Sequence, residues 1–146
     1  MSGRSEWKRI DMLRAVLGGA EGGHVLYGIG DDAAILAPAA ASPGGATAAG
    51  VEPLVWTVDS AVEGVHFRRD LLSFEDLGYR ATMAAASDLA AMGARPVGLL
   101  AALVLPLDVS DDELGALARG QRAACDEIGA AIIGGNLSRG GEISIT

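Results

Sequence analysis

A near-continuous apolar run at residues 97–105 constrains the fold more than any other stretch of the sequence. Its length and composition are typical of a buried β-strand, and Pro96 prevents a preceding helix from continuing into it. Half of the residues are apolar but only 4% are aromatic. The core around this strand is therefore expected to consist of Ala, Leu, Val and Ile, in one domain of ordinary size.

Helices are predicted before and after this strand in the sequence. The first begins at Ser73, with Asp76 completing a weak capping box, and ends near Gly93. Ser110 and Glu113 form a better capping box for the second helix. That helix carries an apolar stripe that makes Cys125 a core residue rather than a nucleophile. The stripe comprises Leu114, Leu117, Ala118, Gln121, Ala124, Cys125 and Ile128.

Shorter elements complete the prediction. A short helix is predicted to be capped by Ser5 and to end at Gly18. Residues 38–53 are predicted to form a long loop, and residues 59–67 a loop that pivots at Gly64. Residues 134–136 are predicted to form a turn. Because helices and strands are interleaved and several connections are hairpin-like, we expect an α+β fold with a mixed β-sheet and helices packed on one face. The remaining strands are predicted at 24–27, 33–37, 54–58, 130–133 (buried) and 142–146.

The charge and the lack of targeting signals exclude several classes of function. A formal net charge of −8 argues against a nucleic-acid partner. No apolar run reaches the ~18–20 residues of a membrane span, and the N-terminus has no signal-peptide core. With its single cysteine, the chain is expected to be cytoplasmic. The sequence stops inside a predicted strand, as expected of a domain from a longer protein or of a truncated reading frame.

Two adjacent carboxylates stand in the segment Gly-Ile-Gly-Asp-Asp-Ala-Ala at 28–34. Glycines permit positive φ and close approach of a ligand. Two like charges in such a turn are tolerable when they are solvated or when a cation lies between them, and Mg²⁺ takes one or two carboxylates plus phosphate oxygens. An ordinary acidic turn is the alternative, and the recurrence of acids at similar junctions favours the cation.

Further acids stand at such junctions. Asp59 follows the strand at 54–58, and Thr57 shares its face two residues earlier. Asp88 falls on an otherwise small and apolar stripe of the first flanking helix, where a buried carboxylate needs a partner. The alternative for Asp59 is an ordinary aspartate at a strand end. The alternatives for Asp88 are a position at the rim of the helix or a pair with an arginine such as Arg95.

Two other groups are candidate ligand contacts. His66, beside Phe67, is a candidate substrate contact, although a lone loop histidine is more often only solvated. The glycines at 134–135 can turn backbone N–H groups toward an anion, with a plain turn as the alternative.

Taken together and in this order, these segments resemble the N-terminal domain of thiamine-monophosphate kinase, within the aminoimidazole ribonucleotide synthetase-like superfamily. The resemblance covers nearly the whole chain apart from residues 38–53, and the block at 87–94 is highly specific to this kinase. The segments are Gly-Ile-Gly-Asp-Asp-Ala-Ala at 28–34, Thr-Val-Asp at 57–59, Glu-Gly-Val-His-Phe at 63–67, Ser-Asp-Leu-Ala-Ala-Met-Gly-Ala-Arg-Pro at 87–96, Ile-Gly-Gly-Asn at 133–136 and Arg-Gly at 139–140.

The resemblance implies an ATP-dependent phosphotransferase that converts thiamine monophosphate to thiamine diphosphate with several Mg²⁺ ions. It implies no catalytic side chain, Gly135 and Asn136 as ATP contacts, and His66 as a contact of thiamine monophosphate. Asn136 stands where the family is expected to have aspartate, which weakens one metal site. The implied metal-binding residues are Asp32, Thr57, Val58 through its carbonyl, Asp59, Asp88 and Asn136.

The family fold also implies a homodimer formed through the sheets. Residues 1–146 are expected to be a single N-terminal domain for ATP, Mg²⁺ and dimerisation, without the C-terminal domain that completes the active site. We therefore expect the chain alone to dimerise and bind Mg²⁺ weakly, with little or no turnover. Another ATP-dependent member of the superfamily and a non-catalytic dimerisation module are the alternatives.

Overall fold

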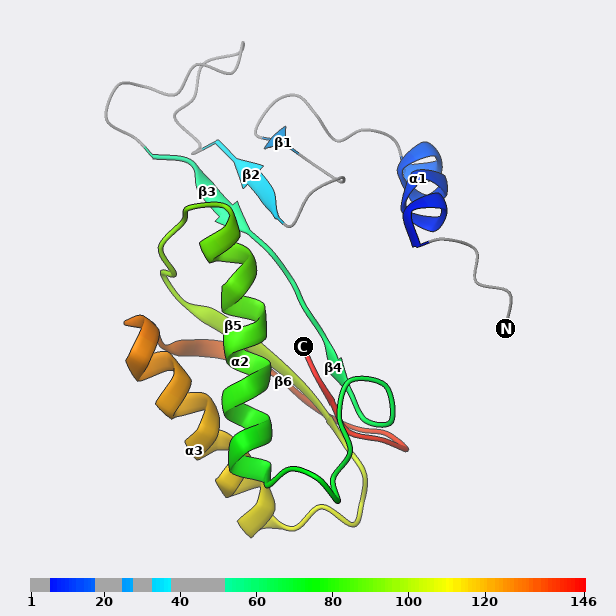
Figure 1. Cartoon of the computed structure of the whole chain (residues 1–146), viewed down its shortest axis with the longest axis vertical. Coiled ribbons are helices and arrows are strands. Elements are labelled where there is room, and N and C mark those ends of the chain that lie inside the picture. The colour runs from blue at the N-terminus through cyan, green and yellow to red at the C-terminus, as the bar shows by residue number, and fades with distance from the viewer. Residues whose placement is uncertain (1–5, 18–24, 28–32, 38–51) are drawn as a thin grey trace. The chain divides into compact units, whose positions relative to one another are not determined.

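The chain forms two compact units, residues 1–57 and residues 58–146. The computed structural model describes residues 6–17, 25–27, 33–37 and 52–146 of them (Figure 1). None of the helices within these ranges has the length and apolarity needed to cross a membrane.

The first unit contains one helix and a small antiparallel sheet. Helix α1 spans Glu6–Leu17, and the strands are β1 (Val25–Tyr27), β2 (Ala34–Leu36) and β3 (Leu54–Trp56). The strand order is β1-β2-β3. All three strands were predicted, although β3 ends two residues before the predicted end. Ser5, Gly18, Asp32 and most of the predicted loop at 38–53 lie outside the described residues.

The second unit contains a four-stranded mixed sheet and two long helices. The strand order is β4-β7-β5-β6, in which β5 and β6 are parallel and the other pairs are antiparallel. Both helices lie on the same face of this sheet (Figure 1). The α+β prediction with a mixed sheet is therefore confirmed. The elements are β4 (Ala61–Val62), α2 (Phe74–Ala91), β5 (Leu99–Leu105), α3 (Asp111–Ile128), β6 (Ile132–Arg139) and β7 (Ser144–Ile145).

The two long helices begin where their capping residues predicted. The Ser73 hydroxyl accepts a hydrogen bond from the backbone N–H of Asp76 at 3.0 Å. At the start of α3, Ser110 and Glu113 make both halves of a capping box. Helix α3 ends at Gly129, whose φ of 71° is the left-handed conformation that glycine adopts at least cost.

The core lies between the sheet and the two helices. Leu117 and Ile143 are fully buried, and they pack with residues from α2, β5 and β7. Cys125 is also buried, and this burial raises the pKa of its thiol, so the side chain is inert, as predicted. The buried cluster comprises Phe67, Leu77, Leu105, Leu117, Ile143 and Ile145.

Two glycines let α2 and α3 touch through their backbones. A Cβ atom on Gly120 would lie 1.8 Å from the carbonyl oxygen of Glu75, and one on Gly78 would lie 2.1 Å from that of Leu117. No side chain fits at either place. The two helices therefore cross closely enough for both to cover one narrow sheet.

Three predictions for this unit are wrong. The segment at 59–67 is not loop throughout, because β4 pairs with β7 inside it. The turn at 134–136 does not exist, because β6 runs through it in parallel register with β5. Gly135 has a φ of 152°, and a Cβ there would lie 1.8 Å from the carbonyl oxygen of Ala101. The glycine pair thus serves a close strand contact, and β6 is exposed at the sheet edge rather than buried.

Replacing Gly120 by alanine tests the helix contact. We expect Gly120→Ala to lower the free energy of unfolding by at least about 2 kcal/mol, because the added methyl group forces the two backbones apart. Gly115→Ala on the same helix is the control, since its Cβ meets only Arg119 Nη1 at 3.6 Å. That control should be neutral or stabilising by up to about 1 kcal/mol. Equal urea-denaturation midpoints for the two variants would contradict the close crossing.

Replacing Ser110 by alanine tests the α3 cap and its pH dependence. The backbone N–H and hydroxyl of Ser110 lower the pKa of Glu113 below its ordinary 4.5. A lowered folded-state pKa gives stability that is present above the unfolded value and is lost as pH falls through the folded value. Ser110→Ala should therefore cost about 1 kcal/mol at neutral pH and less in acid. Urea denaturation at several pH values measures this, and Glu113→Gln should lack the pH-dependent part. A cost that does not change with pH would count against the capping box.

Candidate functional site

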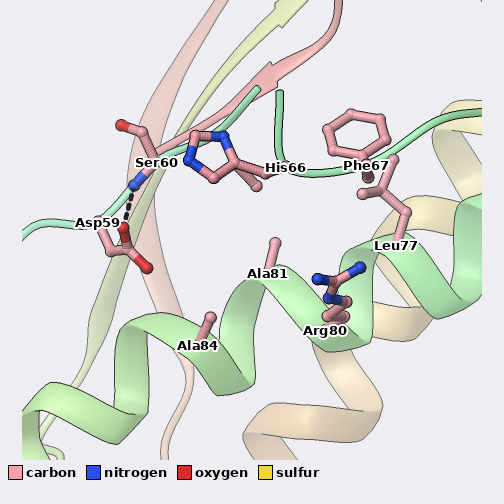
Figure 2. Close-up of a pocket in the computed structure, with 9 residues that line it drawn as sticks. Asp59, Ser60, His66, Phe67, Leu77, Arg80, Ala81 and Ala84 are labelled. Atoms are coloured by element: carbon pink, nitrogen blue, oxygen red, sulfur yellow. Dashed lines mark hydrogen bonds between the residues drawn. The ribbon is translucent and has the colours of Figure 1, made fainter. Parts of the chain in front are cut away.

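A small pocket of about 110 Å³ lies in the second unit, between the segment at 59–67 and helix α2 (Figure 2). Polar side chains come from the segment and from one arginine of the helix, whereas the remaining helix residues are apolar. The pocket therefore joins hydrogen-bonding groups to an apolar wall, as small-molecule sites commonly do. It is lined by Asp59, Ser60, Ala61, His66, Phe67, Leu77, Arg80, Ala81 and Ala84.

Asp59 stands at one end of the pocket. One of its carboxylate oxygens accepts a hydrogen bond from the backbone N–H of Ser60 at 2.7 Å, which orients the group (Figure 2). The other oxygen accepts no hydrogen bond from the residues that the structure describes, so it is available to a ligand. Ser60 is held in turn by a hydrogen bond of 2.8 Å between its hydroxyl and that of Thr146.

His66 lies over the pocket with a defined ring orientation (Figure 2). The backbone N–H of Val62 donates to Nδ1 of His66 at 3.0 Å. Because Nδ1 accepts this hydrogen bond, the neutral ring carries its proton on Nε2. The side chain is exposed, so Nε2–H is able to donate to an acceptor on a bound molecule.

Arg80 is a pocket residue that the sequence analysis missed. It is exposed, and no carboxylate partner exists for it within residues 52–146, unlike Arg69, which binds Glu63 and Asp108. Arg80 lies three residues after Leu77 and four before Ala84, which is the spacing of neighbours on one helix face. That spacing is the signal that could have found it. Its charge makes the pocket suitable for an anionic group.

The apolar stripe predicted on α2 forms the pocket wall. Leu77, Ala81 and Ala84 all line it. Asp88 continues the stripe one turn further, ~6 Å along the helix axis, and is partly exposed. It does not line the pocket itself, so it stands next to the site rather than in it.

Gly135 and Asn136 lie at the other edge of the sheet. Ser60 is opposite Thr146, Thr146 is paired with Ala102, and Ala102 is opposite Asn136. Three strand spacings therefore separate Ser60 from Asn136, or roughly 14 Å. Asn136 also points away from the helices, since its neighbour Leu137 is opposite Leu103, which packs against the core. One metal ion cannot join Asn136 to the pocket.

The remaining predicted residues do not line the pocket or lie outside the described residues. Asp32 lies outside the described residues, and Thr57 is the last residue of the first unit. The Val58 side chain is 75% exposed, which leaves it free of a packing role. Of the predicted site residues, the structure thus brings Asp59 and His66 into one pocket.

The donor set of the pocket fits Mg²⁺ that arrives with a phosphate. Among the residues that the structure describes, no three His, Cys, Asp or Glu side chains gather as a metal cage. Mg²⁺ does not require one, because one or two carboxylates and phosphate oxygens satisfy it. Asp59 supplies such a carboxylate, with one oxygen oriented and the other open.

Comparison with known proteins identifies curated relatives named thiamine-monophosphate kinase. The chain is 41% identical over 110 residues to a thiamine-monophosphate kinase of Synechococcus elongatus, which covers 75% of this chain and 31% of the relative. It is 33% identical over 132 residues to a thiamine-monophosphate kinase of Mycobacterium tuberculosis, covering 90% and 36%. The chain thus spans about a third of the length of these curated relatives.

Solved structures share the fold. AaThiL complexed with AMPPCP and TMP has a TM-score of 0.79 and 28% identity, and the match covers 96% of this chain and 39% of that one. The thiamine-monophosphate kinase of Stenotrophomonas maltophilia K279a has a TM-score of 0.60 and 37% identity, with 97% and 40% covered. These matches confirm the predicted fold class.

The family described as "AIR synthase related protein, N-terminal domain" matches residues 30–146. This range includes the pocket, both long helices and the whole mixed sheet. The chain therefore belongs to the AIR synthase related family, of which it carries the N-terminal domain, and the resemblance to thiamine-monophosphate kinase is confirmed by its relatives.

Proposed function

We propose that this chain is the N-terminal part of a kinase that transfers the γ-phosphoryl group of ATP to thiamine monophosphate, giving thiamine diphosphate. One observation carries the proposal. Asp59 and His66, which the motifs single out, line one pocket in a fold whose solved relative AaThiL was complexed with AMPPCP and TMP. The curated relatives compared above are thiamine-monophosphate kinases, and they support the same reaction.

The polar residues of the pocket bind and orient the acceptor substrate. His66 donates from Nε2, and Arg80 contributes a positive charge from the helix side. Both groups suit the phosphate of thiamine monophosphate. Ala81 and Ala84 leave room beside them and present an apolar surface.

The reaction requires no activated side chain. The attacking atom is a phosphate oxygen of the substrate, which is already anionic near neutral pH. Phosphoryl transfer then depends on positioning and on neutralisation of charge. A site that offers a carboxylate, a histidine and an arginine without a nucleophile–base pair meets that demand.

Mg²⁺ and ATP complete the proposed site. When bound, Mg²⁺ supplies positive charge against the phosphate oxygens. Gly135 and Asn136 would contact ATP. Their distance from the pocket suits an extended substrate that spans the end of the sheet, and it is too long for a single ion site. The residues that would hold the several Mg²⁺ ions are Asp32, Thr57, Val58 through its carbonyl, Asp59, Asp88 and Asn136, with Asn136 and Asp59 at different ions.

Calorimetric titration of the 146-residue chain with thiamine monophosphate in MgCl₂ tests this function. We expect binding, which His66→Gln and Arg80→Gln each weaken by roughly 10- to 100-fold, the usual effect of removing a hydrogen bond to a charged group. Arg68→Gln is the matched control, because Arg68 pairs with Asp70 on the surface and does not line the pocket. It should bind like the unaltered chain.

Two results would count against the proposal. Tighter binding of an aminoimidazole ribonucleotide precursor than of thiamine monophosphate would favour another enzyme of the superfamily. Absence of binding to either compound, with and without an ATP analogue, would favour a non-catalytic module that kept the fold.

We also infer that two copies of the chain associate through the sheet of the second unit. Strand β6 is paired only on its β5 side within residues 58–146 and is exposed along its length. Leu100 and Ile133 beside this edge are 59% and 70% exposed. Both helices cover the other face, so an apolar surface of the sheet remains for a second copy.

Leu100→Glu tests the dimer. In sedimentation equilibrium the unaltered chain should be dimeric and the variant monomeric, because the new carboxylate would be buried without a partner. Leu107→Glu is the control, since Leu107 is 80% exposed in the connection between β5 and α3. A monomeric unaltered chain, or equal masses for the two variants, would overturn this association.

A further inference from the structure

The loop that carries His66 is closed by its own backbone. The N–H of His66 donates to the carbonyl of Val62 at 2.8 Å, while the N–H of Val62 donates to the His66 ring at 3.0 Å. The N–H of Gly64 donates to the carbonyl of Phe67 at 2.8 Å. Gly64 has a φ of 75°, which allows this tight reversal. The ring orientation of His66 thus depends on where Val62 and Phe67 are held.

Glu63 fixes the first end of this loop to the core. Its backbone N–H donates to the carbonyl of Ile143 at 2.9 Å, and its carboxylate accepts from the N–H of Ile143 at 3.1 Å. Ile143 is fully buried, so one residue of the loop holds both backbone groups of a core residue. Val62, the donor to the His66 ring, directly precedes Glu63.

Arg69 connects the far end of the loop to the same carboxylate. Its Nε donates to Glu63 at 2.6 Å, and its Nη1 donates to Asp108 at 2.9 Å. The Glu63 and Arg69 side chains are only 20% and 33% exposed. The two carboxylates raise the pKa of Arg69 above its ordinary value, Glu63 more than Asp108, so the cation is firmly paired. Phe67, two residues earlier, is anchored in the core.

A second ion pair in the same loop shows the contrast. Arg68 binds Asp70 through two hydrogen bonds, but these side chains are 65% and 60% exposed, and within the described residues they form no ion pair across the His66 loop. Exposed pairs of this kind contribute little. The Glu63 pair is less exposed, shares its carboxylate with a backbone N–H of the core, and spans the loop from residue 63 to residue 69.

We propose that Glu63 is a positioning residue, which through Ile143 and Arg69 fixes the loop so that His66 presents Nε2–H to the pocket. The inference rests on the proposed function in one respect, namely that His66 contacts the acceptor substrate. Glu63 does not line the pocket, so it acts only through the loop.

The hydrogen bond between Val62 and His66 provides a direct readout in the folded chain. In the ¹⁵N-labelled 146-residue chain at mildly alkaline pH, we expect an NMR-detected ¹⁵N–¹⁵N coupling between the Val62 amide and Nδ1 of His66, transmitted through the hydrogen bond that joins them. Glu63→Gln should abolish the coupling and speed amide exchange of Val62 by at least about tenfold, because the loop then opens locally. Asp70→Asn, which breaks the exposed pair, should change neither. Retention of the coupling in Glu63→Gln would overturn the proposal.

A binding measurement separates this proposal from the proposed function. In MgCl₂, Glu63→Gln should weaken thiamine monophosphate roughly tenfold, and Asp70→Asn should not. Lost coupling in a chain whose unaltered form does not bind thiamine monophosphate would support the positioning role and refute the function. Binding that His66→Gln weakens and Glu63→Gln leaves unchanged would refute the positioning role alone. If Glu63→Gln does not fold, Arg69→Gln serves the same test, because it removes the link across the loop and leaves the contacts of Glu63 with Ile143. An intact coupling between Val62 and His66 in Arg69→Gln would also refute the positioning role.

Discussion

The contact between the backbones of α2 and α3 governs the second unit. Because Gly78 and Gly120 remove the side chains at the crossing, the two helices approach closely enough to cover the same face of a four-stranded sheet. Leu77 and Leu117, next to these glycines, then reach the core with Ile143. The pocket lies against α2 where this helix carries Ala81 and Ala84 instead of larger residues. Because α2 also packs against α3 through Gly78 and Gly120, the helix that forms the pocket wall is held by two glycines outside the pocket.

Local signals in the sequence were sufficient for the helices and insufficient for the edge of the sheet. Serine capping is decided by residues three apart, so Ser73 and Ser110 marked the two helix starts correctly. Strand β6 is decided by pairing with β5, more than thirty residues earlier in the chain. The glycines at 134–135 look like a turn by composition, but the conformation of Gly135 is needed for its contact with Ala101 inside the ladder. No local pattern distinguishes these two uses of glycine.

The sequence also predicted some residues of the site and missed others. Asp59 and His66 were found because they stand at the ends of recognisable segments, and they line the same pocket. Arg80 was missed because an arginine on a long helix is ordinarily a solvated charge. Its spacing to Leu77 and Ala84 is the sequence signal for it, and in the described part of the chain it has no carboxylate partner, unlike Arg119 and Arg122. The separation of Asn136 from the pocket follows from strand register, which the sequence does not state. Register also explains how residues 60 and 136 share one row of the sheet without sharing a site.

In the proposed function, the arrangement would divide the work of binding two phosphate-bearing substrates. The pocket between the 59–67 segment and α2 offers donors, Nε2–H of His66 and the guanidinium of Arg80, beside the single carboxylate of Asp59. The chain as a whole carries a net charge of −8, so an anionic substrate is repelled at long range and needs concentrated local compensation. In the proposed function, a cation held by carboxylates would supply that compensation near the sheet end, and Arg80 would supply it at the helix. Hydrogen bonds weaken steeply when donor and acceptor are misplaced, so the rigidity of the loop that holds His66 would matter for binding at the proposed site.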